Sequence, residues 1–206
     1  LRRLRREEPA AGEAADACMA LSREHGFPQW LGMARIYGGS ALAARGGVEE
    51  GLAEIREGLA AYLATGAGAE RPTFLTLLAE VHWRRGAWED GLAAISEALH
   101  IIAENGECAY VAELHRLRGE LLLGPLPAGQ DEAEAAFRHA REIARSQSAR
   151  SWELRATTSL ARLWQHQGKR EEARGLLGEV YAWFTEGFET ADLQEAKAVL
   201  EELASP

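Results

Sequence analysis

Hydrophobic residues along most of the chain recur at steps of three and four, which is the spacing of one face of an α-helix. Over residues 87–105 these positions are held by Leu92, Ile95, Leu99 and Ile102. Residues 109–123 repeat the pattern, with polar residues between the apolar ones. The spacing predicts a series of amphipathic helices of about 16–18 residues, each roughly 25 Å long.

Glycines separate these helical stretches at an interval of twenty residues. They stand at Gly26, Gly46, Gly66, Gly86 and Gly106, and the series resumes at Gly168 and Gly187. Ser148 holds one position of the series, and a Gly-Pro-Leu-Pro-Ala-Gly segment at 124–129 interrupts it. Glycine adopts the left-handed backbone conformation that ends many helices. The series therefore predicts where the helices end.

Helix pairs repeat at an interval of about forty residues. The segment ARGGVEEGL at 44–52 matches RRGAWEDGL at 84–92, and QGKREEA at 167–173 repeats the same turn. Small residues enter each second helix at Gly51, Gly91, Ala133 and Ala173. A two-helix repeat of this length is typical of an α-solenoid, in which neighbouring pairs share a core.

The pairs resemble the tetratricopeptide repeat (TPR). Leu160-Ala161 with Trp164 follows the large–small–aromatic pattern of its first helix, and Ala133 with Phe137 follows the pattern of its second. The resemblance implies an all-α protein, a right-handed α-solenoid of antiparallel helix pairs with a C-terminal capping helix. The repeats of about 40 residues are longer than the usual 34 or so.

We expect a single helical-repeat domain over residues 1–206. Residues 1–25 form the second helix of an incomplete repeat in this prediction, residues 26–66, 67–106, 107–148 and 149–187 form helix pairs, and 188–206 form the capping helix. In the capping helix one face is apolar and carries Leu193, Ala196, Leu200 and Leu203. The opposite face, which carries Asp192, Glu195 and Glu202, is expected to face solvent.

A second resemblance covers about residues 26–203. The stretches RPTFLTLLAE (71–80), AELHRLRGELLL (112–123), SWELRATTSLARL (151–163) and YAWFTEGFETADL (181–193) are similar to the C-terminal repeat region of large bacterial multidomain signalling ATPases. Those proteins join this region to a nucleotide-binding switch ATPase and to a class III nucleotide cyclase or a DNA-binding domain. The resemblance implies a regulatory module, a C-terminal fragment of such a signalling or transcription-regulating protein, with the chemistry located upstream.

Composition and charge exclude several classes of function. The formal charge of −9 argues against direct binding to nucleic acid or to an anionic membrane. No apolar run approaches the roughly 20 residues that span a bilayer, and the first residues do not resemble a signal peptide. Cys18 and Cys108 are isolated thiols, which favours a cytoplasmic protein, although a disulfide between them stays open.

No group of residues has the spacing of a catalytic or metal site. A phosphate-binding GxxxxGK[ST] loop is absent from the sequence, and Gly66-Ala67-Gly68 is interpreted as a turn. Glu97 and His100 form a single E-x-x-H, whereas a di-iron bundle needs two such pairs and two further carboxylates. We therefore expect a protein that is not an enzyme and that holds no cofactor or metal.

The first helix of each TPR-like pair lines the inner surface of the solenoid, so its polar residues are the candidate ligand contacts. Arg155 and Arg162, with Arg116 nearby, have the chemistry to hold an acidic segment by bidentate hydrogen bonds. The alternative is that all these positions are simply solvated. The candidates are Met33, Ile36, Ser40, Thr73, Thr76, Glu80, Trp83, Arg84, Glu113, Arg116, Glu120, Arg155, Thr158, Arg162, Gln165 and His166.

Two functions remain open on the sequence. The first is an interaction module that binds a protein segment or its own upstream ATPase domain. The second is a sensor that holds a small-molecule effector. The helix around residues 9–25 has an apolar edge that includes Ala14, Ala17 and Leu21, and no preceding helix is evident to cover it. That edge could drive self-association.

Overall fold

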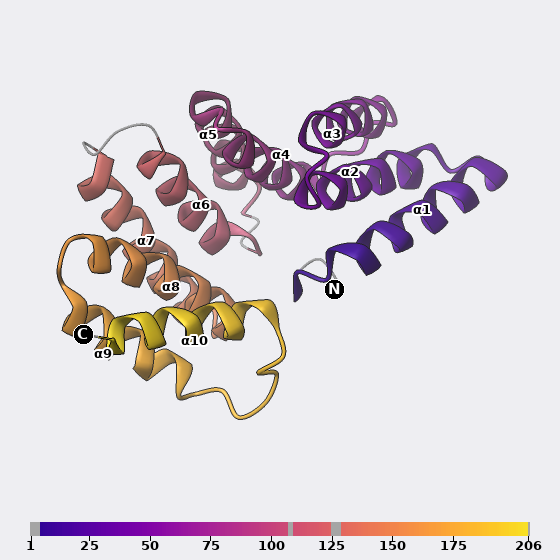
Figure 1. Ribbon diagram of the computed structural model, residues 1–206. Coiled ribbons are helices and arrows are strands. Elements are labelled where there is room, and N and C mark those ends of the chain that lie inside the picture. Colours follow the sequence, from indigo (N-terminus) through magenta and orange to yellow (C-terminus); the bar gives the residue numbers. More distant parts are fainter. Residues whose placement is uncertain (1–4, 107–108, 125–128, 206) are drawn as a thin grey trace. The chain divides into compact units, whose positions relative to one another are not determined.

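The computed structural model describes residues 5–106, 109–124 and 129–205, so Cys108, and with it the disulfide question, lies outside the described residues. The described residues contain ten α-helices and no strand, which confirms the predicted all-α class (Figure 1). Their bounds are α1 Glu8–His25, α2 Pro28–Ala44, α3 Val48–Ala64, α4 Arg71–Arg85, α5 Trp88–Asn105, α6 Val111–Leu123, α7 Gln130–Ser146, α8 Arg150–His166, α9 Arg170–Tyr181 and α10 Ala191–Ala204.

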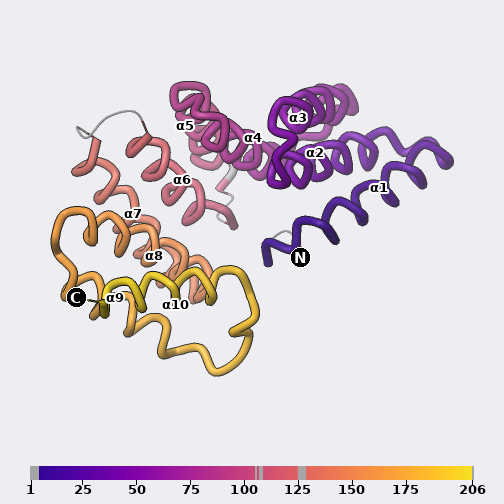
Figure 2. The backbone as a smooth tube through the Cα atoms, in the orientation of Figure 1, coloured from indigo at the N-terminus to yellow at the C-terminus, as the bar shows by residue number. Residues whose placement is uncertain are grey.

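The chain divides into two compact units. Unit 1 covers Leu1–Glu107 and holds α1–α5, and unit 2 covers Cys108–Pro206 and holds α6–α10. Within each unit, consecutive helices pack against each other, as the tube in Figure 2 shows for α2 and α3 and for α8 and α9. The first helices of neighbouring pairs also touch, α2 against α4 and α6 against α8.

The glycine series ends helices as predicted, except at Gly187, which lies in the loop after α9 because that helix already ends at Tyr181. Seven of its glycines have positive φ, from 68° at Gly26 to 104° at Gly46. Ser148, which replaces glycine in the series, has a φ of 55° and adopts the same left-handed conformation. A side chain in this conformation costs roughly 1–2 kcal/mol, so the turn geometry is imposed by the packing of α7 and α8 on either side.

Other glycines lie inside helices where two backbones meet. A Cβ atom on Gly39 of α2 would lie 2.6 Å from the carbonyl oxygen of Gly51 on α3, and one on Gly51 would lie 2.8 Å from the Cβ of Ala43. Any side chain at either position would force the helices apart. The small residues therefore permit the close packing of α2 on α3.

Each unit has its own hydrophobic core. In unit 1, Ile36, Ile55 and Leu77 are fully buried around an edge-to-face contact of Tyr62 with Phe74, whose ring centroids are 5.0 Å apart. In unit 2 the core holds α10 onto α8 and α9. The buried stripe of α10 is Leu193, Ala196, Val199 and Leu203, whereas Leu200, which the sequence placed in the stripe, is only partly buried.

None of the helices in the described ranges has both the length and the apolar character that crossing a bilayer requires.

Candidate functional site

Half of the candidate contact residues lie on α2 and α4 of unit 1, and several of these are not at the surface. The buried ones are Ile36, Ser40, Thr73 and Thr76. The Thr76 hydroxyl donates a hydrogen bond of 2.8 Å to the carbonyl of Pro72, one turn earlier in α4. Met33 packs against the core of unit 1. Ligand contact by these five side chains stays a prediction, and in this structure they serve packing.

The solvent-facing candidates of unit 1 are Glu80, Trp83 and Arg84 at the C-terminal end of α4. Arg84 Nη2 lies 3.0 Å from Glu80 Oε1, one helical turn away, and the Arg84 guanidinium lies 5.9 Å from the centre of the Trp83 ring. Ion pairs of this i,i+4 kind contribute only a few tenths of a kcal/mol when exposed. This end of α4 is therefore a partly exposed polar surface.

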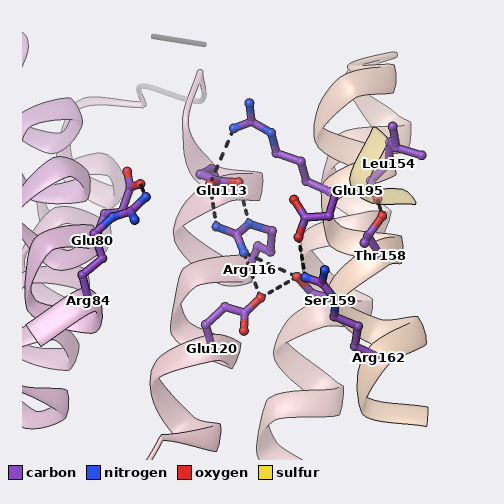
Figure 3. Close-up of polar contacts among 11 residues, drawn as sticks. Glu80, Arg84, Glu113, Arg116, Glu120, Leu154, Thr158, Ser159, Arg162 and Glu195 are labelled. Atoms are coloured by element: carbon purple, nitrogen blue, oxygen red, sulfur yellow. Dashed lines mark hydrogen bonds and ion pairs between the residues drawn. The ribbon is translucent and has the colours of Figure 1, made fainter. Parts of the chain in front are cut away.

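In unit 2 the candidates on α6 meet around Arg116. Its guanidinium donates two hydrogen bonds to the carboxylate of Glu113, at 2.9 and 2.8 Å, and a third of 2.9 Å to Glu120 Oε1 (Figure 3). The hydroxyl of Ser159 on α8 donates to the same Glu120 oxygen at 2.6 Å. The two helices are thus joined by charge-assisted bonds, which are roughly twice as strong as neutral ones.

Arg155 on α8 connects this cluster to α10. Its Nε donates to Asp192 Oδ2 at 2.7 Å, and its Nη1 lies 3.8 Å from Glu113 Oε1. The guanidinium also lies 4.8 Å from the centre of the Trp152 ring. A cation between two carboxylates and an aromatic face is held in one orientation from three sides.

Two more candidates on α8 contact α10. Arg162 pairs with Glu195, and Gln165 Nε2 donates to Glu202 Oε2 at 3.5 Å. Thr158 is buried, with its hydroxyl bonded to the carbonyl of Leu154 at 2.8 Å, and His166 is exposed at the end of α8. We call the surface formed by Glu113, Arg116, Glu120, Arg155, Ser159, Arg162, Gln165, Asp192 and Glu195 the inner wall.

The arginines that the sequence selected for holding an acidic segment lie among carboxylates of the same chain. Each of the three arginines, Arg116, Arg155 and Arg162, is already paired with carboxylates of its own chain. An acidic ligand would have to displace Asp192 and Glu195 from their arginines. A ligand with a basic or amide group needs no such displacement, because carboxylate oxygens accept several hydrogen bonds each.

The structure brings the candidates of α6 and α8 together, and it adds partners on α10 that the sequence did not predict. Asp192 and Glu195 were assigned to a solvent face, whereas the side chain of Asp192 is 11% exposed and both residues pair with α8. The reason is that the polar positions beside the buried stripe of α10 lie against the polar edge of α8. A partial signal does exist, since Asp192 and Glu195 are three residues apart and Arg155 and Arg162 are seven apart, so each pair lies on one face of its own helix.

Two histidines outside the inner wall have unusual surroundings. The rings of His115 on α6 and His139 on α7 lie 4.4 Å apart, and burial, His139 and Arg118 lower the pKa of His115 to about 4. Burial also lowers the pKa of His82, whose Nδ1 lies 3.8 Å from Asp90. In the described part of the chain, no three His, Cys, Asp or Glu residues gather closely enough to hold a metal ion.

Comparison with known proteins supports the fold. No family model matches the chain. A protein of Rhizobium meliloti (strain 1021), itself uncharacterized, is 31% identical over 142 residues; the match covers 69% of this chain but only 14% of that protein. Among solved structures, BtubC (BKLC) from P. vanneervenii superposes with a TM-score of 0.65 at 19% identity, over 97% of this chain and 89% of that one.

A kinesin light chain-like protein of Podosopora anserina, described by its nearly identical TPR-like repeats, superposes with a TM-score of 0.57 at 19% identity. That match covers 88% of this chain and 89% of the other. The chain has a TPR-like fold. In TPR-like terms, α2, α4, α6 and α8 are the first helices of their pairs, and the inner wall is built on the last two of them with α10.

Proposed function

We propose that this chain is a non-catalytic interaction and regulatory module whose two units work as one repeat domain over residues 1–206. It binds a protein segment, or a domain of the larger protein of which it is a part, through the inner wall. The TPR-like fold supports this proposal, because stacked helix pairs are widely used to bind other chains. The observation that carries it is the network around Arg116 and Arg155.

The network favours a particular kind of partner. The four carboxylates of the wall, Glu113, Glu120, Asp192 and Glu195, outnumber its three arginines, so the wall carries a net negative charge. These side chains are held by hydrogen bonds before any ligand arrives, which lowers the entropy cost of binding. We propose that the bound segment presents lysine, arginine or amide groups to this wall.

Photo-crosslinking tests this proposal. A p-benzoylphenylalanine replaces Arg162, which is exposed on the inner wall, and in a matched protein it replaces Arg174, which is exposed on α9. We expect a specific crosslinked product from position 162 and none from 174, and a lower yield when Glu120→Gln is added to the first protein. Equal products from both positions would reject the inner wall as the binding surface.

We further propose that the larger protein is a bacterial signalling or transcription-regulating ATPase, cytoplasmic, with a nucleotide cyclase or DNA-binding domain. The resemblance of residues 26–203 to the repeat region of such proteins supports this. The much greater length of the Rhizobium meliloti protein is also in keeping with a multidomain context. Determining the reading frame upstream of residue 1 tests it: a P-loop ATPase in frame is expected, and a frame without one would reject it.

A second candidate function is the sensing of a small-molecule effector. A groove between α1, α2 and α3 of unit 1 favours it, because its volume of about 300 Å³ is at the lower end of ligand-binding cavities. Thermal unfolding in the presence of a panel of metabolites tests this, since a ligand that binds only the folded chain raises its melting temperature. A panel without any stabilising compound would count against it.

Self-association is a further proposal about partners. Leu21 on α1, Phe27 in the turn and Trp30 at the start of α2 are 57%, 53% and 56% exposed. The predicted apolar edge residues Ala14 and Ala17 are exposed as well. Apolar side chains gathered at one end of a helix pair are typical of surfaces that pack against another chain.

A further inference from the structure

The groove of unit 1 runs along α1, with the α2–α3 pair on its other side. Gly12 and Gly38 lie at its base, and Met19 and Leu42 supply apolar wall. Helices α1 and α2 are antiparallel neighbours, because Gly12 of α1 faces the Arg45 end of α2, while Gly38 of α2 faces Ala15 and Met19 of α1. The groove therefore has a defined direction, from Arg45 at one end toward Arg23 at the other.

The arginines around the groove are not equivalent. Arg35 is committed to its own chain: Nε donates to Glu54 at 2.9 Å and Nη2 to Glu57 at 2.5 Å, and the bond to Glu54 raises the Arg35 pKa. Arg23 and Arg45 are exposed, and among the described residues neither makes an ion pair or a side-chain hydrogen bond. Their guanidinium groups are available to a ligand.

Asp16 is the third available charge. It is exposed, lines the groove between the two arginines, and makes no ion pair within the described part of the chain. It lies one helical turn from Gly12, where the Arg45 guanidinium comes within 3.5 Å of the position of a Cβ. Arg23 lies two turns further along α1, about 10 Å by helix geometry, a span that an arginine side chain and a short ligand bridge together.

The base of the groove is more open than helix packing requires. A Cβ on Gly12 would meet its nearest neighbours at 3.5 and 3.8 Å, and one on Gly38 would meet Ala15 and Met19 at 3.4 and 3.8 Å. These are ordinary contacts, unlike the overlaps at Gly39. Alanine is the better helix residue at both positions, so the glycines have no packing role and leave the base open.

We propose that this groove binds an acidic α-amino acid, whose α-carboxylate lies at Arg45, whose ammonium group lies at Asp16 and whose side-chain carboxylate extends toward Arg23. Two free cations and one free anion in the groove match two carboxylates and one ammonium in the ligand. Met19 and Leu42 contact the methylene groups between them. This inference rests on the effector-sensing candidate and is independent of the inner wall.

The two methionines of the chain make a direct test possible. Met19 lines the groove, and Met33, on the same unit, does not. Protein labelled with ¹³C at the methionine methyl groups is titrated with sodium L-glutamate and L-aspartate, against sodium chloride at equal ionic strength, and Met33→Leu assigns the two signals. We expect a saturable shift of the Met19 signal with either amino acid, and an unchanged Met33 signal.

Variants with matched controls locate the contacts. Arg23→Gln with Arg45→Gln removes the two available cations and is expected to weaken binding by at least about tenfold, since charge-assisted bonds are lost. Arg118→Gln with Arg174→Gln makes the same charge change in unit 2 and is expected to leave the affinity unchanged. Asp16→Asn is expected to weaken L-glutamate but not glutarate, which lacks the ammonium group.

The glycines give a second, steric test. Gly12→Ala with Gly38→Ala raises the base of the groove and is expected to weaken L-glutamate by about fivefold or more, while Gly175→Ala with Gly178→Ala on α9, where a Cβ meets open space, has no effect. An unmoved Met19 signal, equal shifts of both methionines, or equal affinities in the two arginine pairs would overturn the proposal.

Two further outcomes separate this inference from the candidate function beneath it. Tighter binding of the peptide acetyl-Glu-Leu-Glu-amide than of free L-glutamate would overturn the proposal and assign the groove to a protein segment. A Met19 shift with an uncharged metabolite, but not with L-glutamate or L-aspartate, would reject the acidic amino acid and retain the groove as an effector site.

Discussion

Arg155 on α8 donates a 2.7 Å hydrogen bond to Asp192 on α10, across 37 residues of sequence, and the two side chains are only 13% and 11% exposed. The pair ties the last helix to the inner wall at its N-terminal end, while the buried stripe of α10 holds the rest. The same contact that completes the fold therefore also neutralises a cation on the candidate binding surface.

Removing the carboxylate of this pair should destabilise unit 2. Asp192→Ala removes the carboxylate that accepts the 2.7 Å hydrogen bond of a largely buried guanidinium, and we expect a loss of about 1–3 kcal/mol in the free energy of unfolding. Urea denaturation measures it. Lys197→Ala, which removes an exposed ion pair with Glu201 on the same helix, is the control and should change stability by less than about 0.5 kcal/mol. Equal losses of stability in both variants would mean that the buried pair stabilises unit 2 no more than the exposed pair does.

His115 should make unit 2 sensitive to acid. Its pKa of about 4 in the folded chain is below the ordinary value near 6.5, so the unfolded chain takes up a proton first as the pH falls. The contribution of neutral His115 to the free energy of unfolding is complete above pH 6.5, declines between pH 6.5 and pH 4, and is lost below about pH 4. We expect it to reach about 2 kcal/mol, reduced for partial exposure.

Unfolding of the wild type and His115→Asn at pH 7.5, 5.5 and 4.5 measures this dependence. The variant should lose less stability than the wild type between the first and last of these. Parallel pH profiles would show that the surroundings of His115 do not disfavour its charged form.

The two kinds of internal glycine should respond in opposite directions to alanine. Gly39→Ala places a Cβ 2.6 Å from the Gly51 carbonyl and 2.9 Å from the Cβ of Glu54, and we expect a loss of about 2 kcal/mol or more as α2 and α3 separate. Gly178→Ala on α9 meets open space and should stabilise by about 0.5–1 kcal/mol. Thermal denaturation compares the two, and destabilisation by Gly178→Ala would contradict this account of α9.

Ser148 offers a stabilising change at a turn. Its φ of 55° suits glycine, so Ser148→Gly should remove part of the strain and raise stability by about 1 kcal/mol. The reverse change at an equivalent turn, Gly168→Ser, where φ is 78°, should lower it by a similar amount. Chemical denaturation of both variants checks the pair, and a loss of stability in Ser148→Gly would show that the serine side chain has another role.

The exposed apolar residues near the α1–α2 turn should control association. We expect the average mass of the wild-type chain to rise with concentration because it self-associates. Replacing Leu21, Phe27 and Trp30 by serine removes the apolar surface, so the variant should keep the mass of the monomer at every concentration. Analytical ultracentrifugation over a range of concentrations measures it. Trp183→Ser, which removes an equally exposed tryptophan from unit 2, should leave association unchanged. A wild-type chain that is monomeric at every concentration would reject self-association.

The local features of this protein followed from the sequence by itself. The step of three and four in the apolar residues predicted the helices. The glycine series predicted the turns, including the turn at which Ser148 adopts a left-handed conformation. Both succeed because helix periodicity and backbone conformation depend on residues that are near one another in the chain. The sequence also predicted that Arg116 lies near Arg155 and Arg162, and the structure has them on two helices that touch, α6 and α8.

Only the tertiary structure decided what those polar residues contact. Asp192 and Glu195 reach Arg155 and Arg162 because α10 packs its apolar stripe between α8 and α9, which sets the rotation of the helix about its axis. The groove along α1 likewise depends on how α1 packs against α2, where Gly12 faces Arg45 and Gly38 faces Ala15 and Met19. Periodicity assigns a residue to a face of its own helix, but the partner across an interface is set by helix crossing and side-chain volume, which are properties of the packed whole.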